Sequence, residues 1–285
     1  MACVEGSQEE MNSEKMFTAQ KVTEHIIRII GVSGEIMYVV TGSRKNIAID
    51  CGVGIGHIRN YIQNVLGIEL DSVILTHGHI DHMGGAGEFD HIYLNKYDYE
   101  LAGTHYTRQK QIEHLKMNGK DASEIDEKEY CQFRQLSFEE INPGDVFDLG
   151  DITLEIYEGK GHTQGQITIL IPEERYLFLG DACNNLVFLF LEEASSVKEY
   201  KGMLENLRDN LRGKYDHILV SHGTGYEEPE IIEDVIQVCQ DILTGDTDDI
   251  PFQLFGQNGY IARRIESDNS RTDKKRGNIV YSRIE

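Results

Sequence analysis

Three histidines and one aspartate fall within six positions of a single segment. Residues 76–85 read Thr-His-Gly-His-Ile-Asp-His-Met-Gly-Gly, so the side chains in question are His77, His79, Asp81 and His82. Neutral imidazole and carboxylate are the side chains that bind Zn²⁺ and similar first-row metals. Burying four such groups for packing alone is unfavourable, because each needs its own polar partner. The spacing therefore indicates a metal site rather than a polar surface turn.

Three further residues of the same types lie at the ends of predicted strands or in glycine-flanked turns. His162 lies in Gly-Lys-Gly-His-Thr-Gln-Gly, Asp181 follows the run Tyr176–Gly180, and His222 follows the run His217–Ser221. A single histidine in a turn is usually only solvated, so none of the three indicates a site by itself. Together with the first segment they supply five histidines and two aspartates, enough for two metal ions that share one carboxylate.

These motifs, in this order, resemble the metallo-β-lactamase superfamily. The resemblance rests on H-x-H-x-D-H, the later G-H-T-x-G, the G-D after a strand and the last strand-end histidine, and it is greatest to the dinuclear glyoxalase II-like hydrolase branch. It spans about residues 22–225. It implies an α/β fold, an αββα four-layer sandwich of two mixed β-sheets, with the site at one edge of the sheets. It also implies the ligand sets: His77, His79 and His162 for one metal, Asp81, His82 and His222 for the other, and Asp181 as the bridge.

The resemblance implies a metal-dependent hydrolase with two divalent metal ions, Zn²⁺ in first place and Fe or Mn as alternatives. A hydroxide that bridges the two metals would attack a small thioester, ester or lactone. Asp81 is the predicted catalytic residue, because its carboxylate would orient this hydroxide and accept its proton. Asp50, at the end of another predicted strand, is either a hydrogen-bond partner of a ligand histidine or a turn-forming aspartate.

Other functions remain open on the same motifs. A mononuclear iron persulfide dioxygenase would use part of the ligand set, and a phosphodiesterase or nuclease would suit the metals but not the charge of the chain. A metal-stabilised binding module without catalysis is a further alternative. The complete second-metal set favours the hydrolase. Acidic residues follow His222 where glyoxalase II has a basic glutathione-binding region, so we expect a substrate other than a glutathione thioester; they are Glu227, Glu228 and Glu230.

Strands and helices must bring these distant residues together. Ser72–Thr76 and His217–Val220 are apolar runs of the kind found in strands buried on both faces, and they end directly before His77 and just before His222. Apolar residues at helical spacing predict helices over residues 55–66, 200–211 and 231–243, with Ser196 and Glu199 as a capping box. Strands in consecutive pairs predict mixed sheets. Further strands are predicted at Ile26–Ile30, Ile36–Thr41, Asn46–Asp50, His91–Leu94, Val146–Leu149, Ile152–Tyr157, Ile167–Ile171, Tyr176–Leu179, Tyr260–Ile265 and Ile279–Ile284.

The chain is predicted to form a single metallo-β-lactamase-type domain over residues 22–285, after a poorly structured segment of residues 1–20. Residues 96–136 are polar, rich in tyrosine and too long for a simple connection. They are predicted to be a helical insert or cap, with helices around Tyr97–Met117 and Ile125–Leu136.

The charge and the cysteine content of the chain indicate which classes of partner and which compartment to expect. Lys and Arg total 27 against 49 Asp and Glu, a formal charge of −22 that repels nucleic acids and anionic lipids. We therefore expect a small-molecule substrate, with no nucleic acid and no membrane as partner; the oligomeric state is not predicted. No secretory signal is readable at the polar start of the chain, and five scattered cysteines fit a reducing cytoplasm. Cys51 and Cys183 are expected to be small buried apolar residues.

Overall fold

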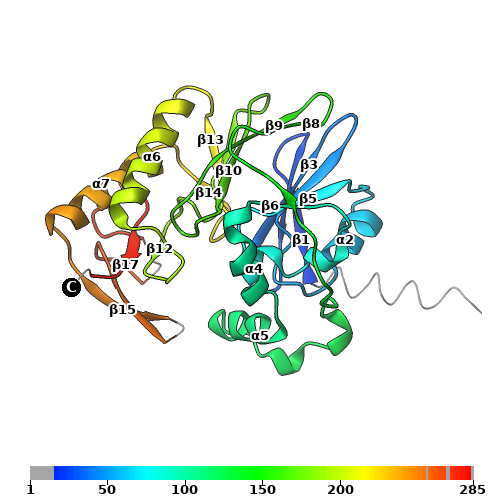
Figure 1. Cartoon of the computed structure of the whole chain (residues 1–285), viewed down its shortest axis with the longest axis horizontal. Coiled ribbons are helices and arrows are strands. Elements are labelled where there is room, and N and C mark those ends of the chain that lie inside the picture. The colour runs from blue at the N-terminus through cyan, green and yellow to red at the C-terminus, as the bar shows by residue number, and fades with distance from the viewer. Residues whose placement is uncertain (1–15, 255, 268–269, 284–285) are drawn as a thin grey trace, which may run out of the picture. The chain divides into compact units, whose positions relative to one another are not determined.

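The computed structural model describes residues 16–254, 256–267 and 270–283 (Figure 1). The chain divides into two compact units. Unit 1 runs to Ile141 and includes Phe147–Thr153, and unit 2 comprises Asn142–Val146 and Leu154 onward. Of the segment predicted to be poorly structured, residues 1–15 lie outside the described residues, whereas its last residues begin a strand at Thr18.

Unit 1 is built on a mixed sheet. Among the described residues, seven strands form it in the order β1-β2-β3-β4-β5-β6-β7. Neighbouring strands are antiparallel from β1 to β4 and parallel from β4 to β7. All three residues of β5 are buried, as its apolar run predicts. The bounds are Thr18–Lys21 (β1), Ile26–Ile30 (β2), Ile36–Thr41 (β3), Asn46–Ile49 (β4), Ser72–Ile74 (β5), Ile92–Leu94 (β6) and Glu139–Glu140 (β7).

Short helices follow the strands of unit 1. The predicted helix over residues 55–66 is present as α2, which is continued by the π-helix η1. The segment of residues 76–85, which contains the first four ligand-type side chains, continues into α3. The predicted helix Tyr97–Met117 is interrupted, because Thr107 is extended and its side chain accepts a hydrogen bond from the N–H of Lys110 to cap a new helix. The bounds are Ile58–Asn60 (α2), Tyr61–Val65 (η1), Ile80–Met83 (α3), Ala86–Glu88 (η2), Lys96–Asp98 (η3), Tyr99–His105 (α4) and Arg108–Met117 (α5).

The predicted helix Ile125–Leu136 is wrong. Only two 3₁₀ turns form near it, η4 (Ala122–Glu124) and η5 (Glu127–Glu129). The Asp126 side chain accepts a hydrogen bond from the N–H of Lys128, a local contact that competes with helix propagation. Tyr130 then forms a β-bridge with Ile55, so the chain leaves the turn in an extended conformation.

Two further mixed sheets lie mainly in unit 2; Phe147, Asp148 and Thr153 of the larger sheet belong to unit 1. Among the described residues, the larger has the strand order β14-β13-β11-β10-β9-β8 and the smaller the order β12-β17-β16-β15. Strand β15 contains Pro251 and lies at an edge of its sheet, where proline is tolerated. The bounds are Val146–Asp148 (β8), Thr153–Glu158 (β9), Ile167–Ile171 (β10), Tyr176–Phe178 (β11), Val187–Leu189 (β12), His217–Leu219 (β13), Tyr226–Glu227 (β14), Ile250–Leu254 (β15), Gln257–Ile261 (β16) and Ile279–Tyr281 (β17).

Helices α6 (Val197–Leu211) and α7 (Ile231–Thr244) pack against each other in unit 2 (Figure 1). The predicted capping box is present, because Ser196 and Glu199 each accept a hydrogen bond from the backbone of the other. The predicted apolar face of α6 is buried in a core shared with α7 and with strands of both sheets. Among the helices in the described part of the chain, none combines the length and apolarity needed to cross a membrane.

Candidate metal centre

The four ligand-type residues of the first segment converge at the end of β5 in unit 1. His77, His79 and His82 are buried, and Nε2 of His77 lies 3.1 Å from Nδ1 of His79. The ring centroids of His77 and His82 are 4.0 Å apart. Asp81 is half-buried, and its Oδ2 lies 3.5 Å from Nε2 of His82. This part of the predicted ligand set is therefore one cluster of imidazole and carboxylate groups.

Asp50 fixes the orientation of His82. Its carboxylate is buried, and Oδ2 accepts a hydrogen bond from Nδ1 of His82 at 2.7 Å. Oδ1 accepts from the N–H of Thr76 at 2.8 Å, so the same carboxylate also holds the start of the segment. With Nδ1 donating to Asp50, the lone pair of His82 is on Nε2, as a metal ligand requires. Of the two roles open from the sequence, these contacts favour the partner of a ligand histidine.

Three residues from the 96–136 segment also reach this cluster. Buried Asp98 accepts a hydrogen bond from the N–H of Gly78 at 3.0 Å and so holds the turn between the first two histidines. Nδ1 of His114 lies 3.8 Å from Oδ2 of Asp81, and the ring of His105 lies 4.7 Å from that of His79. Both histidines look ordinary in the sequence, because no spacing relates them to the motif.

Unit 2 holds the second cluster, with Asp181 at its centre. Oδ2 of Asp181 lies 3.1 Å from Nε2 of His222 and 3.9 Å from Nε2 of His162. Nδ1 of His162 lies 3.0 Å from the carbonyl oxygen of Phe188 and donates to it, which places the lone pair of this imidazole on Nε2. Asn184 donates to the other carboxylate oxygen of Asp181 at 3.2 Å. The three strand-end residues predicted from the sequence are thus brought together around one carboxylate.

The turn that carries His162 depends on a close approach to α6. A Cβ added at Gly161 would overlap the ring of Tyr200. That ring is fully buried, and its hydroxyl donates to the carbonyl oxygen of Ala182 at 2.6 Å. Because burial and this hydrogen bond hold the Tyr200 ring in place, it cannot move to make room for a larger residue at position 161.

We therefore expect Gly161→Ala to lower the free energy of unfolding by about 1–3 kcal/mol, the usual cost of overpacking. The midpoint of urea unfolding measures this change. Gly202→Ala is the matched control, since Gly202 lies in α6 and a Cβ there meets nothing within 4 Å. The control should gain up to about 1 kcal/mol of stability. Equal midpoints for Gly161→Ala and the wild type would contradict the packing argument.

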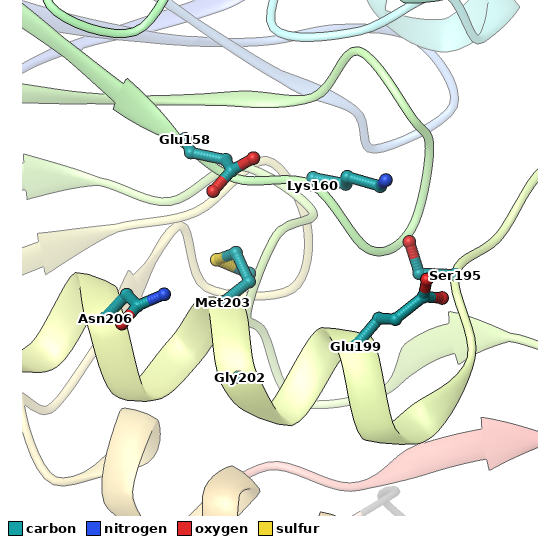
Figure 2. A pocket seen from close by; sticks show the side chains of 7 residues that line it. All are labelled: Glu158, Lys160, Ser195, Glu199, Gly202, Met203 and Asn206. Atoms are coloured by element: carbon teal, nitrogen blue, oxygen red, sulfur yellow. The ribbon is translucent and has the colours of Figure 1, made fainter.

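A pocket borders the same turn in unit 2 (Figure 2). It measures about 280 Å³ and lies between the end of β9 and helix α6. Lys160, two residues before His162, shares the lining with two carboxylates and so offers both signs of charge. The lining residues are Glu158, Lys160, Ser195, Glu199, Gly202, Met203 and Asn206.

Two further observations concern residues that the sequence analysis names near the clusters. Cys51 and Cys183 are buried, as expected, and burial raises the pKa of both thiols above its usual range. The acidic residues that follow His222 are partly paired with a cation. The Arg276 guanidinium lies 3.5 Å from the carboxylate of Glu227 and 3.7 Å from that of Glu228.

Comparisons with known proteins identify the family and the fold of the chain. The family model of the metallo-β-lactamase superfamily matches residues 31–223, about two thirds of the chain. The acyl-coenzyme A thioesterase MBLAC2 of Gallus gallus is 23% identical over 197 residues, which cover 65% of this chain and 71% of that protein. The atrochrysone carboxyl ACP thioesterase of Emericella nidulans is 26% identical over 168 residues, 57% of this chain and 45% of that protein. A solved metallo-β-lactamase from Pontibacter korlensis matches with a TM-score of 0.57 at 16% identity, over 79% of this chain and 99% of that one.

Proposed function

This chain belongs to the metallo-β-lactamase superfamily and has its fold, and from that premise we propose that it hydrolyses acyl thioesters at a centre of two divalent metal ions. The observation that carries the proposal is the convergence of seven predicted ligands into two clusters, one in each unit, with a carboxylate in each. We assign His77, His79 and His162 to one metal, Asp81, His82 and His222 to the other, and Asp181 to both.

The donor set fits divalent metal ions. His82 and His162 each donate Nδ1–H to an oxygen outside the ligand set, the first to Asp50 and the second to the Phe188 carbonyl. Metal-ligating histidines almost always show this arrangement, because the second hydrogen bond fixes the tautomer and aims the other nitrogen at the metal. Imidazole and carboxylate donors without thiolate suit Zn²⁺, and Fe or Mn as alternatives.

Metal ions bound there would polarise the substrate carbonyl and lower the pKa of a coordinated water toward about 7. The protein's own groups then have separate tasks. Asp81 accepts the proton of the attacking water, Asp50 keeps His82 oriented, and Asp98 holds the backbone of the turn through Gly78. Water adds to the carbonyl carbon, the carbon–sulfur bond breaks, and the products are a carboxylic acid and a thiol.

The relatives and the charge of the chain indicate which class of substrate to expect and which part of it is bound. The two relatives are described as thioesterases, one of acyl-coenzyme A and one of an acyl carrier protein substrate. A formal charge of −22 works against recognition of the phosphates that such carriers hold. We therefore propose that the acyl chain, rather than the phosphates of the carrier, supplies most of the binding energy.

An aromatic cluster in unit 2 supports an apolar acyl chain. Phe188 holds His162 through its carbonyl, and its half-buried ring lies 5.5 Å from that of Phe190 and 5.7 Å from that of Phe252. Leucine side chains at residues 186, 191 and 254 are only partly buried against the same cluster. Apolar surface that remains accessible beside a predicted metal ligand is suited to a hydrocarbon chain.

Metal quantification and a substrate panel test the proposal. We expect about two metal ions per chain and release of thiol from acyl thioesters. Each methylene that becomes buried should raise kcat/KM by up to about fourfold, which is about 0.8 kcal/mol. Phosphodiesters serve as the comparison class. Cleavage of phosphodiesters without thiol release would reject the thioesterase assignment, and a protein purified without metal that hydrolyses thioesters would reject the metal centre.

A further inference from the structure

A second group of metal-type donors lies in unit 1 and shares no residue with the ligand set above. His57 precedes α2, Glu88 ends η2, and Cys131 follows η5. Oε1 of Glu88 lies 2.8 Å from Nδ1 of His57, and Sγ of Cys131 lies 3.9 Å from the same nitrogen. One nitrogen, one oxygen and one sulfur thus lie within 4.8 Å of one another.

Each donor is also held from its far side. Nε2 of His57 lies 2.9 Å from the carbonyl oxygen of Lys128, which turns Nδ1 toward the other two donors. The second carboxylate oxygen of Glu88 accepts a hydrogen bond from the N–H of Arg59 at 3.1 Å. The N–H of Cys131 donates to the carbonyl oxygen of Gly54 at 2.9 Å. Ligands whose other polar atoms are bonded in this way are typical of protein metal sites.

The backbone at His57 is an unusual one. Its φ is +60°, in the left-handed region that costs a non-glycine residue free energy. A glycine would adopt this conformation without strain. The strained backbone therefore occurs at one of the three donor residues.

Burial and charge favour a dication between these groups. Cys131 is 1% exposed, and the side chains of Glu88 and His57 are 14% and 32% exposed. Burial raises the pKa of the Cys131 thiol well above its usual range, and the nearby Glu88 carboxylate adds to the effect. A dication would neutralise both the carboxylate and a thiolate, and the partial exposure of His57 leaves a route for its entry.

The separations are close to those of a tetrahedral zinc site. Zn–N and Zn–O bonds of about 2.0–2.2 Å and a Zn–S bond of about 2.3 Å place the donors about 3.3–3.6 Å from one another. The observed 2.8 and 3.9 Å differ from these values by about half an ångström. The fourth position would be open to water.

We propose that His57, Glu88 and Cys131 form an additional site for a divalent metal of the zinc type. The ion would join the segment after η5 to the turn before α2. The two segments already meet through the hydrogen bond from Gly56 N–H to the Glu129 carbonyl oxygen, at 2.7 Å. The competing explanation is an ion pair between His57 and Glu88 with Cys131 as a packing residue. The hydrogen bond to Glu88, which raises the pKa of His57 to about 9, describes that metal-free state.

Cobalt binding separates the two explanations. The ligand set proposed for catalysis contains no cysteine, so a near-ultraviolet thiolate-to-cobalt charge-transfer band reports on this site alone. We expect the band when Co²⁺ is titrated into the metal-free full chain under reducing, oxygen-free conditions. Cys131→Ser should abolish it, and Cys239→Ser, a change at another buried cysteine, should preserve it.

His57→Gln gives a second measurement that does not depend on the folding of Cys131→Ser. It keeps the thiol and should weaken Co²⁺ binding, followed through the same band, by at least about tenfold. Absence of the band in the wild-type chain would leave the ion pair as the explanation and overturn the proposal. Persistence of the full band in folded Cys131→Ser, or unchanged affinity in His57→Gln, would overturn it equally.

Discussion

Replacement of Asp181 by alanine is expected to lower kcat/KM for thioester hydrolysis by at least about a thousandfold. The carboxylate lies 3.1 Å from Nε2 of His222 and 3.9 Å from Nε2 of His162, so it is the group that relates the two imidazoles of unit 2. Its removal takes away the ligand assigned to both metals and leaves the imidazoles without an intervening anion. A loss of about 4 kcal/mol of transition-state stabilisation corresponds to that factor.

Initial rates and metal content, measured on the same preparation, check this prediction. Asp209→Ala is the matched control, because Asp209 is an exposed aspartate of α6 that pairs with Arg208 at the surface. Its removal should leave the rate unchanged and alter stability by no more than about 0.5 kcal/mol. A folded Asp181→Ala protein with wild-type turnover and two metals per chain would remove Asp181 from the proposed centre.

The parts of the fold that the sequence predicts well are those set by local pattern. β5 is buried at every residue, and its run is apolar after Ser72; α6 follows its capping box and its apolar face. The helix expected over 125–136 fails because side-chain oxygens at Asp121 and Asp126 bond the backbone two residues on, a competition that apolar spacing does not reveal.

Some residues of the candidate site can likewise be identified from the sequence, and others only from the structure. Residues in the motif or at strand ends are identifiable, because their type and position are both unusual for a packed side chain. Asp98 and His114 are not, since they lie in helical segments of ordinary composition and meet the cluster only through tertiary structure. Asp50 is intermediate: its place at a strand end is visible in the sequence, but only the contact with His82 favours a positioning role over a turn.

That contact makes Asp50→Asn the second change with a large expected effect. Asp50 has a φ of +61°, a conformation that asparagine tolerates well, so the substitution tests the side chain with little backbone strain. The carboxylate accepts from the Thr76 N–H, the Thr76 hydroxyl and Nδ1 of His82. An amide has one acceptor oxygen in place of two, so at least one of these buried donors loses its partner.

We expect Asp50→Asn to weaken metal binding by about 10–100-fold, because His82 remains a ligand but is no longer held in one orientation. Activity measured against added metal should show the midpoint raised by that factor and kcat largely recovered at saturation. Asp249→Asn is the control, since Asp249 also has a positive φ of 52° but contacts Tyr281 and Arg283 instead; its metal dependence should match that of the wild type. If Asp50→Asn binds metal as the wild type does, Asp50 only shapes the turn, and the hydrogen bond to Asp50 is not what orients His82.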